Sequence, residues 1–203
     1  MTLSIVIPMK SPERSKSRLA KVLSRNQRKK LALSLFERNL CFFRDKYPQH
    51  NLLVVTESPR IQDIAEGYGA EVLLETEKLA GLNAAVSLAA EYNAERGVET
   101  QLVIPGDIQA IDFGEIETLL SYRVANRSVI VCPAYDGGTN AIMTTPPNVM
   151  PFSFGPGSSQ IHLLAGFQAG LNTRRLYLES LSFDVDRPED LHREDIGFEQ
   201  LSA

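Results

Sequence analysis

The stretch Leu3-Ser-Ile-Val-Ile-Pro8 guides the interpretation of the whole chain, because it is short, apolar and ended by a proline. Such a run is typical of a buried strand. A loop rich in Lys and Arg follows it, and apolar residues then recur at helical spacing from about Asn26 to Lys46. A strand followed by a helix in this way is the first half of a β-α-β unit.

The same alternation continues through the first half of the chain. Ser58 followed by proline favours a helix start, and Gly97 favours a helix end. The pattern predicts an α/β fold with a mostly parallel sheet flanked by helices, in which ligands bind outside the carboxyl ends of the strands. The further strands are expected at Asn51–Thr56, Glu71–Leu74 and Gln101–Ile104, and the helices at Pro59–Gly67 and Leu82–Arg96.

The second half of the chain is less regular. No repeat and no linker divides the sequence, so a single domain over residues 1–203 is expected. The elements expected here are a helix over Phe113–Val124, strands at Ser128–Pro133, Ala141–Thr144 and Arg174–Glu179, a glycine-rich loop over Phe152–Ser159, a helix over Gln160–Gly170 and a last helix from Pro188.

The composition is that of an ordinary globular protein and argues against several classes. Of 203 residues, 43% are hydrophobic and 23% are charged, so a sizeable core can form. The net charge of −4 argues against broad nucleic-acid binding. No apolar run is long enough for a membrane span or a signal peptide. The two cysteines stand far apart, which favours a reducing compartment, so a cytoplasmic protein is expected.

Three acidic residues are expected after strands. Asp107 follows a buried strand through Pro105-Gly106, and Asp184 and Asp186 stand two apart after a later strand. Residues two apart in an extended chain face the same way. Asp107 alone could be a turn residue and Asp186 a helix cap, but three carboxylates together favour a site for Mg²⁺, which prefers oxygen ligands.

Basic residues crowd into the loop after the first strand, where Lys10, Lys16 and Arg18 lie close together. Such a loop can wrap a triphosphate through charge-assisted hydrogen bonds, and it can equally be a solvated loop. Neither GxxxxGK[ST] nor GxGxxG occurs in the sequence, so the loop is neither a P-loop nor a dinucleotide fingerprint.

Three further motifs are rich in glycine and small polar residues. Gly81-Leu-Asn83 precedes a helix, so Asn83 is either a plain first-turn residue or a group that contacts a base edge. Asp136-Gly-Gly-Thr-Asn140 and Phe154-Gly-Pro-Gly-Ser158 can present backbone N–H groups to an anion. His162 follows the second of these loops, and either a structural role or contact with a substrate is open to it.

In order along the chain, these segments resemble the 2-phospho-L-lactate guanylyltransferases of deazaflavin coenzyme F-420 biosynthesis, which are relatives of the molybdenum-cofactor guanylyltransferases. The resemblance implies a GT-A/Rossmann-like nucleotidyltransferase domain that transfers GMP from GTP to the phosphate of a small phospho-acid and releases pyrophosphate. The matching segments are Pro8-Met-Lys10, Ser15-Lys-Ser-Arg-Leu19, Gly81-Leu-Asn-Ala84, Pro105-Gly-Asp107, Gly138-Thr-Asn-Ala141, Phe154-Gly-Pro-Gly-Ser158 with His162, and Asp184-Val-Asp186 with Pro188-Glu-Asp-Leu191.

The resemblance also implies roles for individual residues, in four groups. Lys10, Lys16 and Arg18 would hold the GTP phosphates, Gly81 and Asn83 would lie by the guanine, Asp107, Asp184 and Asp186 would hold Mg²⁺, and Thr139, Gly155 and Ser158 would bind the phospho-acid.

Three positions depart from the family pattern. Ile108-Gln109 stand where the family often has proline, Ser159 where Phe is common, and Arg187 where Thr is usual. The second and third of these lie near the acid-binding and metal loops, and the acid stays open among 2-phospho-L-lactate, phosphoenolpyruvate and 3-phospho-D-glycerate.

The expected partners are GTP and a small phosphorylated carboxylic acid, with no nucleic acid and no membrane, and a homodimer is compatible with the sequence. The alternatives are another nucleotidyltransferase, a glycosyltransferase that uses Asp184-Val-Asp186 as a DxD motif, and a non-catalytic nucleotide-binding module.

Overall fold

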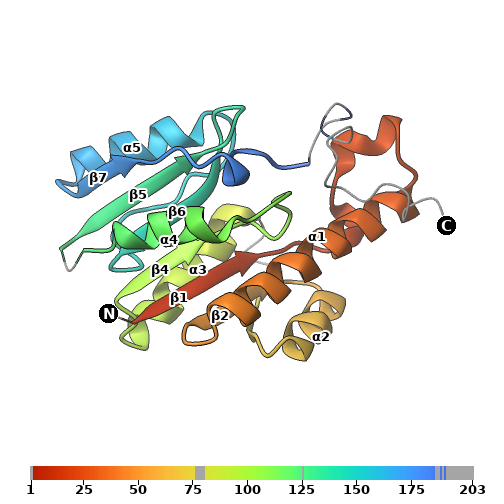
Figure 1. The fold of residues 1–203 in the computed structure, drawn as a ribbon, viewed down its shortest axis with the longest axis horizontal. Coiled ribbons are helices and arrows are strands. Elements are labelled where there is room, and N and C mark those ends of the chain that lie inside the picture. Colours follow the sequence, from red (N-terminus) through yellow and green to blue (C-terminus); the bar gives the residue numbers. More distant parts are fainter. Residues whose placement is uncertain (1, 76–80, 125, 186–187, 189, 191–203) are drawn as a thin grey trace.

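The structure is a computed structural model that describes residues 2–75, 81–124, 126–185, 188 and 190. Its strands come from both halves of the chain and join one sheet (Figure 1). The strands are β1 (Leu3–Pro8), β2 (Asn51–Thr56), β3 (Glu71–Leu74), β4 (Thr100–Val103), β5 (Ser128–Pro133), β6 (Thr139–Thr145) and β7 (Asn172–Arg175).

The sheet has the order β3-β2-β1-β4-β6-β5-β7. β1 pairs in parallel with β2 and β4, β2 pairs in parallel with β3, and β5 pairs in parallel with β7. β6 alone reverses direction, because it is antiparallel to both β4 and β5. The predicted α/β fold with a mostly parallel sheet is therefore confirmed.

Helices cover both faces of the sheet. The α-helices are α1 (Arg25–Lys46), α2 (Pro59–Gly67), α3 (Leu82–Glu95), α4 (Phe113–Ser121) and α5 (Ser158–Gln168), and the short 3-10 helices are η1 (Pro12–Arg14), η2 (Ser17–Lys21) and η3 (Ser180–Ser182). In the part of the chain that the structure describes, no helix has both the length and the apolar character needed to cross a bilayer.

Two apolar layers form, one on each face of the sheet. On one face α1, α2 and α4 pack through residues such as Phe36, Ile61 and Leu119. On the other face α3 and α5 pack through residues such as Val86 and Leu163. Every residue of β1, β4, β5 and β6 is buried, which is the pattern of strands covered on both sides.

Element boundaries in the second half differ from the prediction. α4 ends at Ser121 and β6 begins at Thr139, so the turn cluster before Ala141 supplies the start of that strand. α5 begins at Ser158, directly after Gly157 in the left-handed conformation (φ 69°), so the glycine-rich loop is shorter than predicted. β7 spans Asn172–Arg175 rather than the predicted Arg174–Glu179, because its pairing with β5 runs from Asn172 to Arg175. The helix predicted from Pro188 lies mostly outside the described residues.

Candidate active site

The carboxyl ends of β1 and β4 lie side by side, because the two strands pair in parallel. The strand order runs from β1 to β2 and β3 on one side and to β4 on the other, so a topological switch point lies here. The turn Pro105-Gly106-Asp107 after β4 packs closely against α1: a Cβ atom on Gly106 would lie 3.0 Å from the Phe36 side chain. Glycine therefore allows this turn to sit directly over the core.

An ion pair between Lys16 and Asp107 joins the loop after β1 to the turn after β4. The Lys16 Nζ lies 2.7 Å from the Asp107 Oδ2, and the Lys16 side chain is fully buried while that of Asp107 is 27% exposed. Burial alone would raise the pKa of Asp107, but the Lys16 ammonium and the more distant Lys10 charge hold it below its usual value. Asp107 is therefore an ionised carboxylate that still reaches solvent.

The burial of Lys16 was not expected from the sequence, which allowed a solvated loop residue. Its backbone φ of 54° makes it the one non-glycine residue with positive φ in the described ranges. Such a conformation is rare for a long side chain and is maintained here by tertiary contacts. Nothing in the local sequence signals it, because the partner Asp107 stands 91 residues away.

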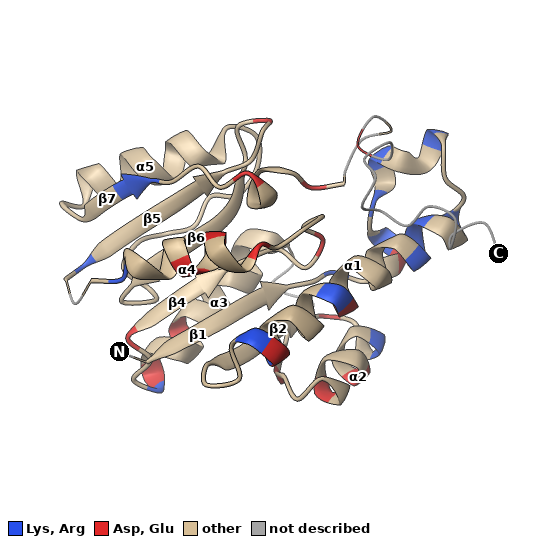
Figure 2. Ribbon diagram, viewed as in Figure 1, with Lys and Arg blue, Asp and Glu red and all other residues tan. Residues whose placement is uncertain are grey.

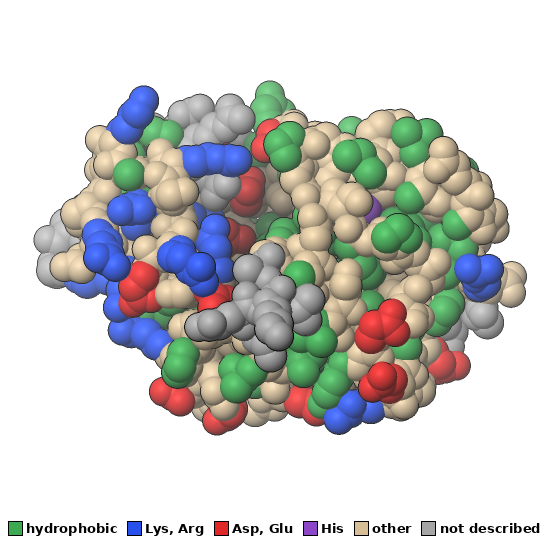
Figure 3. All heavy atoms as spheres, turned by 180° about the vertical axis from the view of Figure 1, so that it is seen from behind, with side chains coloured by type: hydrophobic (Ala, Val, Ile, Leu, Met, Phe, Trp, Pro, Cys, Tyr) green, Lys and Arg blue, Asp and Glu red, His purple; other side chains and the backbone are tan. Residues whose placement is uncertain are grey.

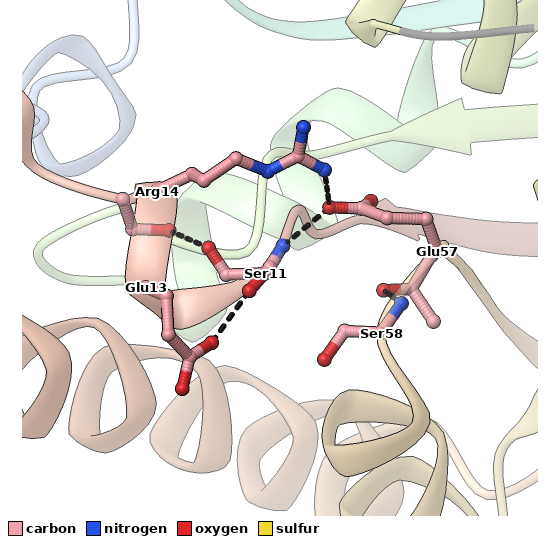
Figure 4. Close-up of polar contacts among 7 residues, drawn as sticks. Ser11, Glu13, Arg14, Glu57 and Ser58 are labelled. Carbon is pink, nitrogen blue, oxygen red and sulfur yellow. Dashed lines mark hydrogen bonds and ion pairs between the residues drawn. The ribbon is translucent and has the colours of Figure 1, made fainter. Parts of the chain in front are cut away.

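Glu57, directly after β2, anchors the loop that carries Lys16. Its carboxylate accepts a hydrogen bond from the Ser11 backbone N–H (2.8 Å) and pairs with Arg14, as Figure 4 shows. On the other side of the loop Glu13 pairs with Lys29 of α1 at 2.5 Å, and this contact is the main reason why the pKa of Glu13 falls to about 2. Sequence reasoning missed Glu57, although an acid at the carboxyl end of a strand beside β1 is a signal that could have found it.

Asn39 holds the turn that carries Asp107. It lies on the apolar face of α1 and is 1% exposed. Its Nδ2 donates to the backbone carbonyls of Gly106 (3.3 Å) and Ile108 (3.4 Å), the residues on either side of Asp107. A buried amide without partners would be costly, so the two bonds explain a polar residue in this position. This residue was also missed, although a lone polar side chain at a core position of a helix marks it.

Basic side chains gather beside this site. Figure 2 shows Lys and Arg on the loop after β1 and along α1, and Lys10 and Arg18 are both exposed. Figure 3 shows Lys and Arg side chains at the edge of a hollow in which acidic side chains are visible. Cations that could bind a polyphosphate therefore lie next to an ionised carboxylate.

Asp184 reaches the same place from the far end of the chain. A short antiparallel bridge pairs it with Ile108, the neighbour of Asp107. It does not directly follow a strand as predicted, because η3 lies between it and β7. Asp186 and Arg187 lie outside the described residues. Within the residues that are described, no three His, Cys, Asp or Glu side chains form a group that could hold a metal, so the three-carboxylate set stays a prediction.

A network of neutral groups joins the start of β6 to α5. The Ser158 hydroxyl donates to the Thr139 Oγ1, and the Thr139 Oγ1 lies 3.0 Å from the His162 Nδ1. The Ser153 backbone N–H donates to the His162 Nε2 at 2.9 Å. Burial lowers the pKa of His162 to about 4, so the ring is neutral at pH 7. The structure thus gives His162 a structural role and brings the predicted residues Thr139 and Ser158 together.

Asn83 links α3 to the loop before α5. Its Nδ2 donates to the Phe154 carbonyl (3.3 Å), and its Oδ1 accepts from the Phe154 backbone N–H (2.6 Å). Both ends of the amide are thus engaged within the protein, which favours a structural role over contact with a base. Gly81 precedes α3 with φ 110°, and Gly155 in the linked loop is exposed with φ 142°. Their roles toward ligands stay predictions.

The fold is shared with a solved nucleotidyltransferase structure. A nucleotidyl transferase from Methanothermobacter thermautotroptrophicus superposes with a TM-score of 0.71 over 98% of this chain and 98% of that chain, at 14% sequence identity. At that identity the likeness concerns the fold.

The chain belongs to the family described as guanylyl transferase CofC like, which it matches over residues 3–196. It is 48% identical over 191 residues to a 3-phospho-D-glycerate guanylyltransferase of Colwellia psychrerythraea, covering 94% of this chain and 90% of the relative. It is 33% identical over 194 residues to a phosphoenolpyruvate guanylyltransferase of Rubrobacter xylanophilus, covering 95% and 93%. The protein is therefore an enzyme of the nucleotidyltransferase class, and the predicted family is confirmed.

Proposed function

We propose that this protein transfers GMP from GTP to the phosphate of 3-phospho-D-glycerate and releases pyrophosphate. The observation that carries the proposal is the Lys16–Asp107 ion pair at the switch point of the sheet, beside exposed basic residues. The choice of acid is supported by the 48% identity to the Colwellia psychrerythraea protein, with phosphoenolpyruvate as the second candidate.

The basic residues would bind the triphosphate. Lys10 and Arg18 are exposed, and the Lys16 ammonium is held in place by Asp107. Charge-assisted hydrogen bonds to phosphate oxygens are strong, and cations arranged in advance stabilise the charge that develops on a departing pyrophosphate. The loop would therefore orient the α-phosphorus of GTP and neutralise the leaving group.

The reaction itself needs no general base. An oxygen of the acid's phosphate forms a bond to the α-phosphorus, and the bond from that phosphorus to the bridging oxygen of pyrophosphate breaks. A phosphate monoester has a second pKa of about 6 and is mostly a dianion at neutral pH. The neutral, buried His162 is consistent with this, since it is already bonded within the protein.

We propose Mg²⁺ as the cofactor, held by Asp107, Asp184 and Asp186. The donor set fits a hard cation, because Asp107 is ionised and Asp184 pairs through a short β-bridge with Ile108, the residue after Asp107. When bound, Mg²⁺ would neutralise phosphate charge.

Thr139, Gly155 and Ser158 are the residues proposed to bind the phospho-acid, and Gly81 and Asn83 would lie close to the guanine. The place proposed for the reaction, from the family resemblance, is the biosynthesis of coenzyme F-420. A cytoplasmic location stays an expectation from the composition, and a homodimer stays compatible with it.

Measurement of pyrophosphate release with a panel of nucleotides and acids tests the proposal. GTP, ATP and CTP are each combined with 3-phosphoglycerate, phosphoenolpyruvate, 2-phospholactate and glucose 1-phosphate, with Mg²⁺ or with excess EDTA. We expect release with GTP and 3-phosphoglycerate, lost in EDTA and restored by Mg²⁺.

Preference for glucose 1-phosphate would contradict the proposed acid and indicate a sugar nucleotidyltransferase. Full activity in EDTA would contradict the metal while leaving the transfer intact. No release with any pair would favour a glycosyltransferase or a non-catalytic binding module.

A further inference from the structure

The neutral network leaves one hydroxyl proton unused. The His162 Nε2 accepts from the Ser153 backbone N–H, so in the neutral ring the Nδ1 carries the proton and donates to Thr139. Thr139 and Ser158 have two hydroxyl protons between them, and the single hydrogen bond that joins the two hydroxyls uses one. The other has no acceptor among the described residues, so it is free for a ligand.

A break in the strand register places Asn140 next to this hydroxyl pair. Cys132 pairs with Ala141 while Pro133 pairs with Thr139, so Asn140 is the extra residue of a bulge in β6. Bulges disturb the alternation of side chains and can redirect one of them.

Thr139 and Asn140 consequently lie on the same face of the sheet, although they are adjacent. Thr139 is bonded to His162 of α5. Asn140 stands two residues before Ile142, so the two lie on the same face of the strand. Ile142 packs in the same apolar layer as Leu163 of α5. Since β6 runs antiparallel to β4 with Ile142 opposite Val103, Asn140 also lies beside the turn that carries Asp107.

The side-chain Nδ2 of Asn140 is buried and has no hydrogen-bond partner among the described residues. The residue as a whole is 6% exposed. Nearly all buried amide groups in proteins are paired, and an unpaired one costs about 1–3 kcal/mol. Such a group, next in the chain to the Thr139 hydroxyl and beside the turn that carries Asp107, indicates a missing ligand that accepts hydrogen bonds.

We propose that the Asn140 Nδ2, together with the free hydroxyl proton of the Thr139–Ser158 pair, binds an anionic oxygen of the phospho-acid. This inference rests on the proposed function and adds Asn140 to it as a residue that binds the phospho-acid. The phospho-acid is the chosen ligand because the Thr139–Ser158 hydroxyl pair, proposed above to bind it, lies beside Asn140 on the same face of the sheet. A phosphate of GTP carries the same kind of anionic oxygen and is the competing ligand.

Equilibrium titrations of the full chain with 3-phosphoglycerate alone and with GTP alone separate the two sources, and they require no turnover. The variants are Asn140→Ser, Asn140→Asp and the control Asn172→Ser, which makes a comparable change on the exposed residue at the start of β7. We expect Asn140→Ser to weaken 3-phosphoglycerate binding about 10- to 100-fold, the range for a lost hydrogen bond to a charged group. Asn140→Asp should weaken it further, and the control should stay within about twofold.

Unchanged 3-phosphoglycerate affinity in Asn140→Ser would overturn the inference, and a loss confined to GTP would assign Asn140 to the nucleotide instead. If the variants do not fold, the side-chain amide resonance of Asn140 in the wild-type NMR spectrum decides: it should shift with 3-phosphoglycerate and not with GTP, and a resonance that stays in place overturns the inference. Binding without pyrophosphate release from the wild type would contradict the proposed function alone.

Discussion

The two sides of the site hold their buried polar groups in different ways. At the ends of β1 and β4 a buried ammonium, that of Lys16, faces the carboxylate of Asp107. At the start of β6 and α5, Ser158, Thr139 and His162 share neutral hydrogen bonds. A charge pair stabilises only while both partners are present, because removing one leaves a buried charge. Removing one member of a neutral network costs hydrogen bonds but leaves no buried charge. Such a network responds to pH when it includes a histidine.

The charged side should respond most strongly to loss of the carboxylate. If Asp107 holds the proposed Mg²⁺, we expect Asp107→Asn to lower kcat/KM for pyrophosphate release about 10³-fold, because an electrostatic group aimed at the reacting phosphates is lost. Asp63→Asn makes the same change on the exposed face of α2 and should leave kcat/KM unchanged. An active Asp107→Asn variant would remove Asp107 from the catalytic site.

Loss of the ammonium should destabilise the fold as well. Lys16→Met keeps most of the buried volume but leaves the Asp107 carboxylate without its ammonium partner. We expect a loss of about 2–4 kcal/mol in the free energy of unfolding. This loss is smaller than for a fully buried pair, because Asp107 reaches solvent. Denaturant unfolding near pH 7 measures it, with the exposed Lys21→Met as control. The double variant Lys16→Met, Asp107→Asn should recover part of the loss, and a Lys16→Met variant as stable as the wild type would restore the solvated-loop interpretation.

The neutral side should show its dependence on pH. The folded protein keeps His162 unprotonated down to about pH 4, whereas the unfolded chain binds that proton below about 6.5. The contribution of the neutral His162 to the free energy of unfolding is therefore fully present above pH 6.5. It is lost as the pH falls toward 4, by up to about 3 kcal/mol. The difference in unfolding free energy between wild type and His162→Gln should shrink over this range, and a difference that is constant with pH would contradict the buried neutral ring.

The hydrogen bonds between α3 and the loop before α5 should matter least for stability. Asn83→Ala removes both hydrogen bonds between α3 and Phe154, and we expect a loss of about 1 kcal/mol or less because Asn83 is exposed. Thermal unfolding measures this loss, and the KM for GTP measured alongside shows whether the amide also lies by the nucleotide. A large rise in KM with no change in stability would favour contact with the base.

The sequence could predict the elements of the first half because their determinants are local. β1, β2 and β3 have the predicted bounds, since short apolar runs between turn residues identify strands. The boundaries around β6, α5 and β7 could not be predicted as well. The left-handed Gly157, the bulge at Asn140 and the point where β7 begins to pair with β5 depend on neighbouring strands and helices.

By itself, the sequence determined the fold class, the family and the motifs that the strand ends bring together, because residue type and periodicity are sufficient for these. Only the tertiary structure decided that Lys16 is buried against Asp107 and that Asn39 and Glu57 hold the loops of the site. It also decided that the Asn140 Nδ2 has no hydrogen-bond partner among the described residues. The physical reason is sequence separation: the contacts of Lys16, Asn39 and Glu57 join residues 43 to 91 positions apart, and burial of a charge or an amide is decided by what packs around it.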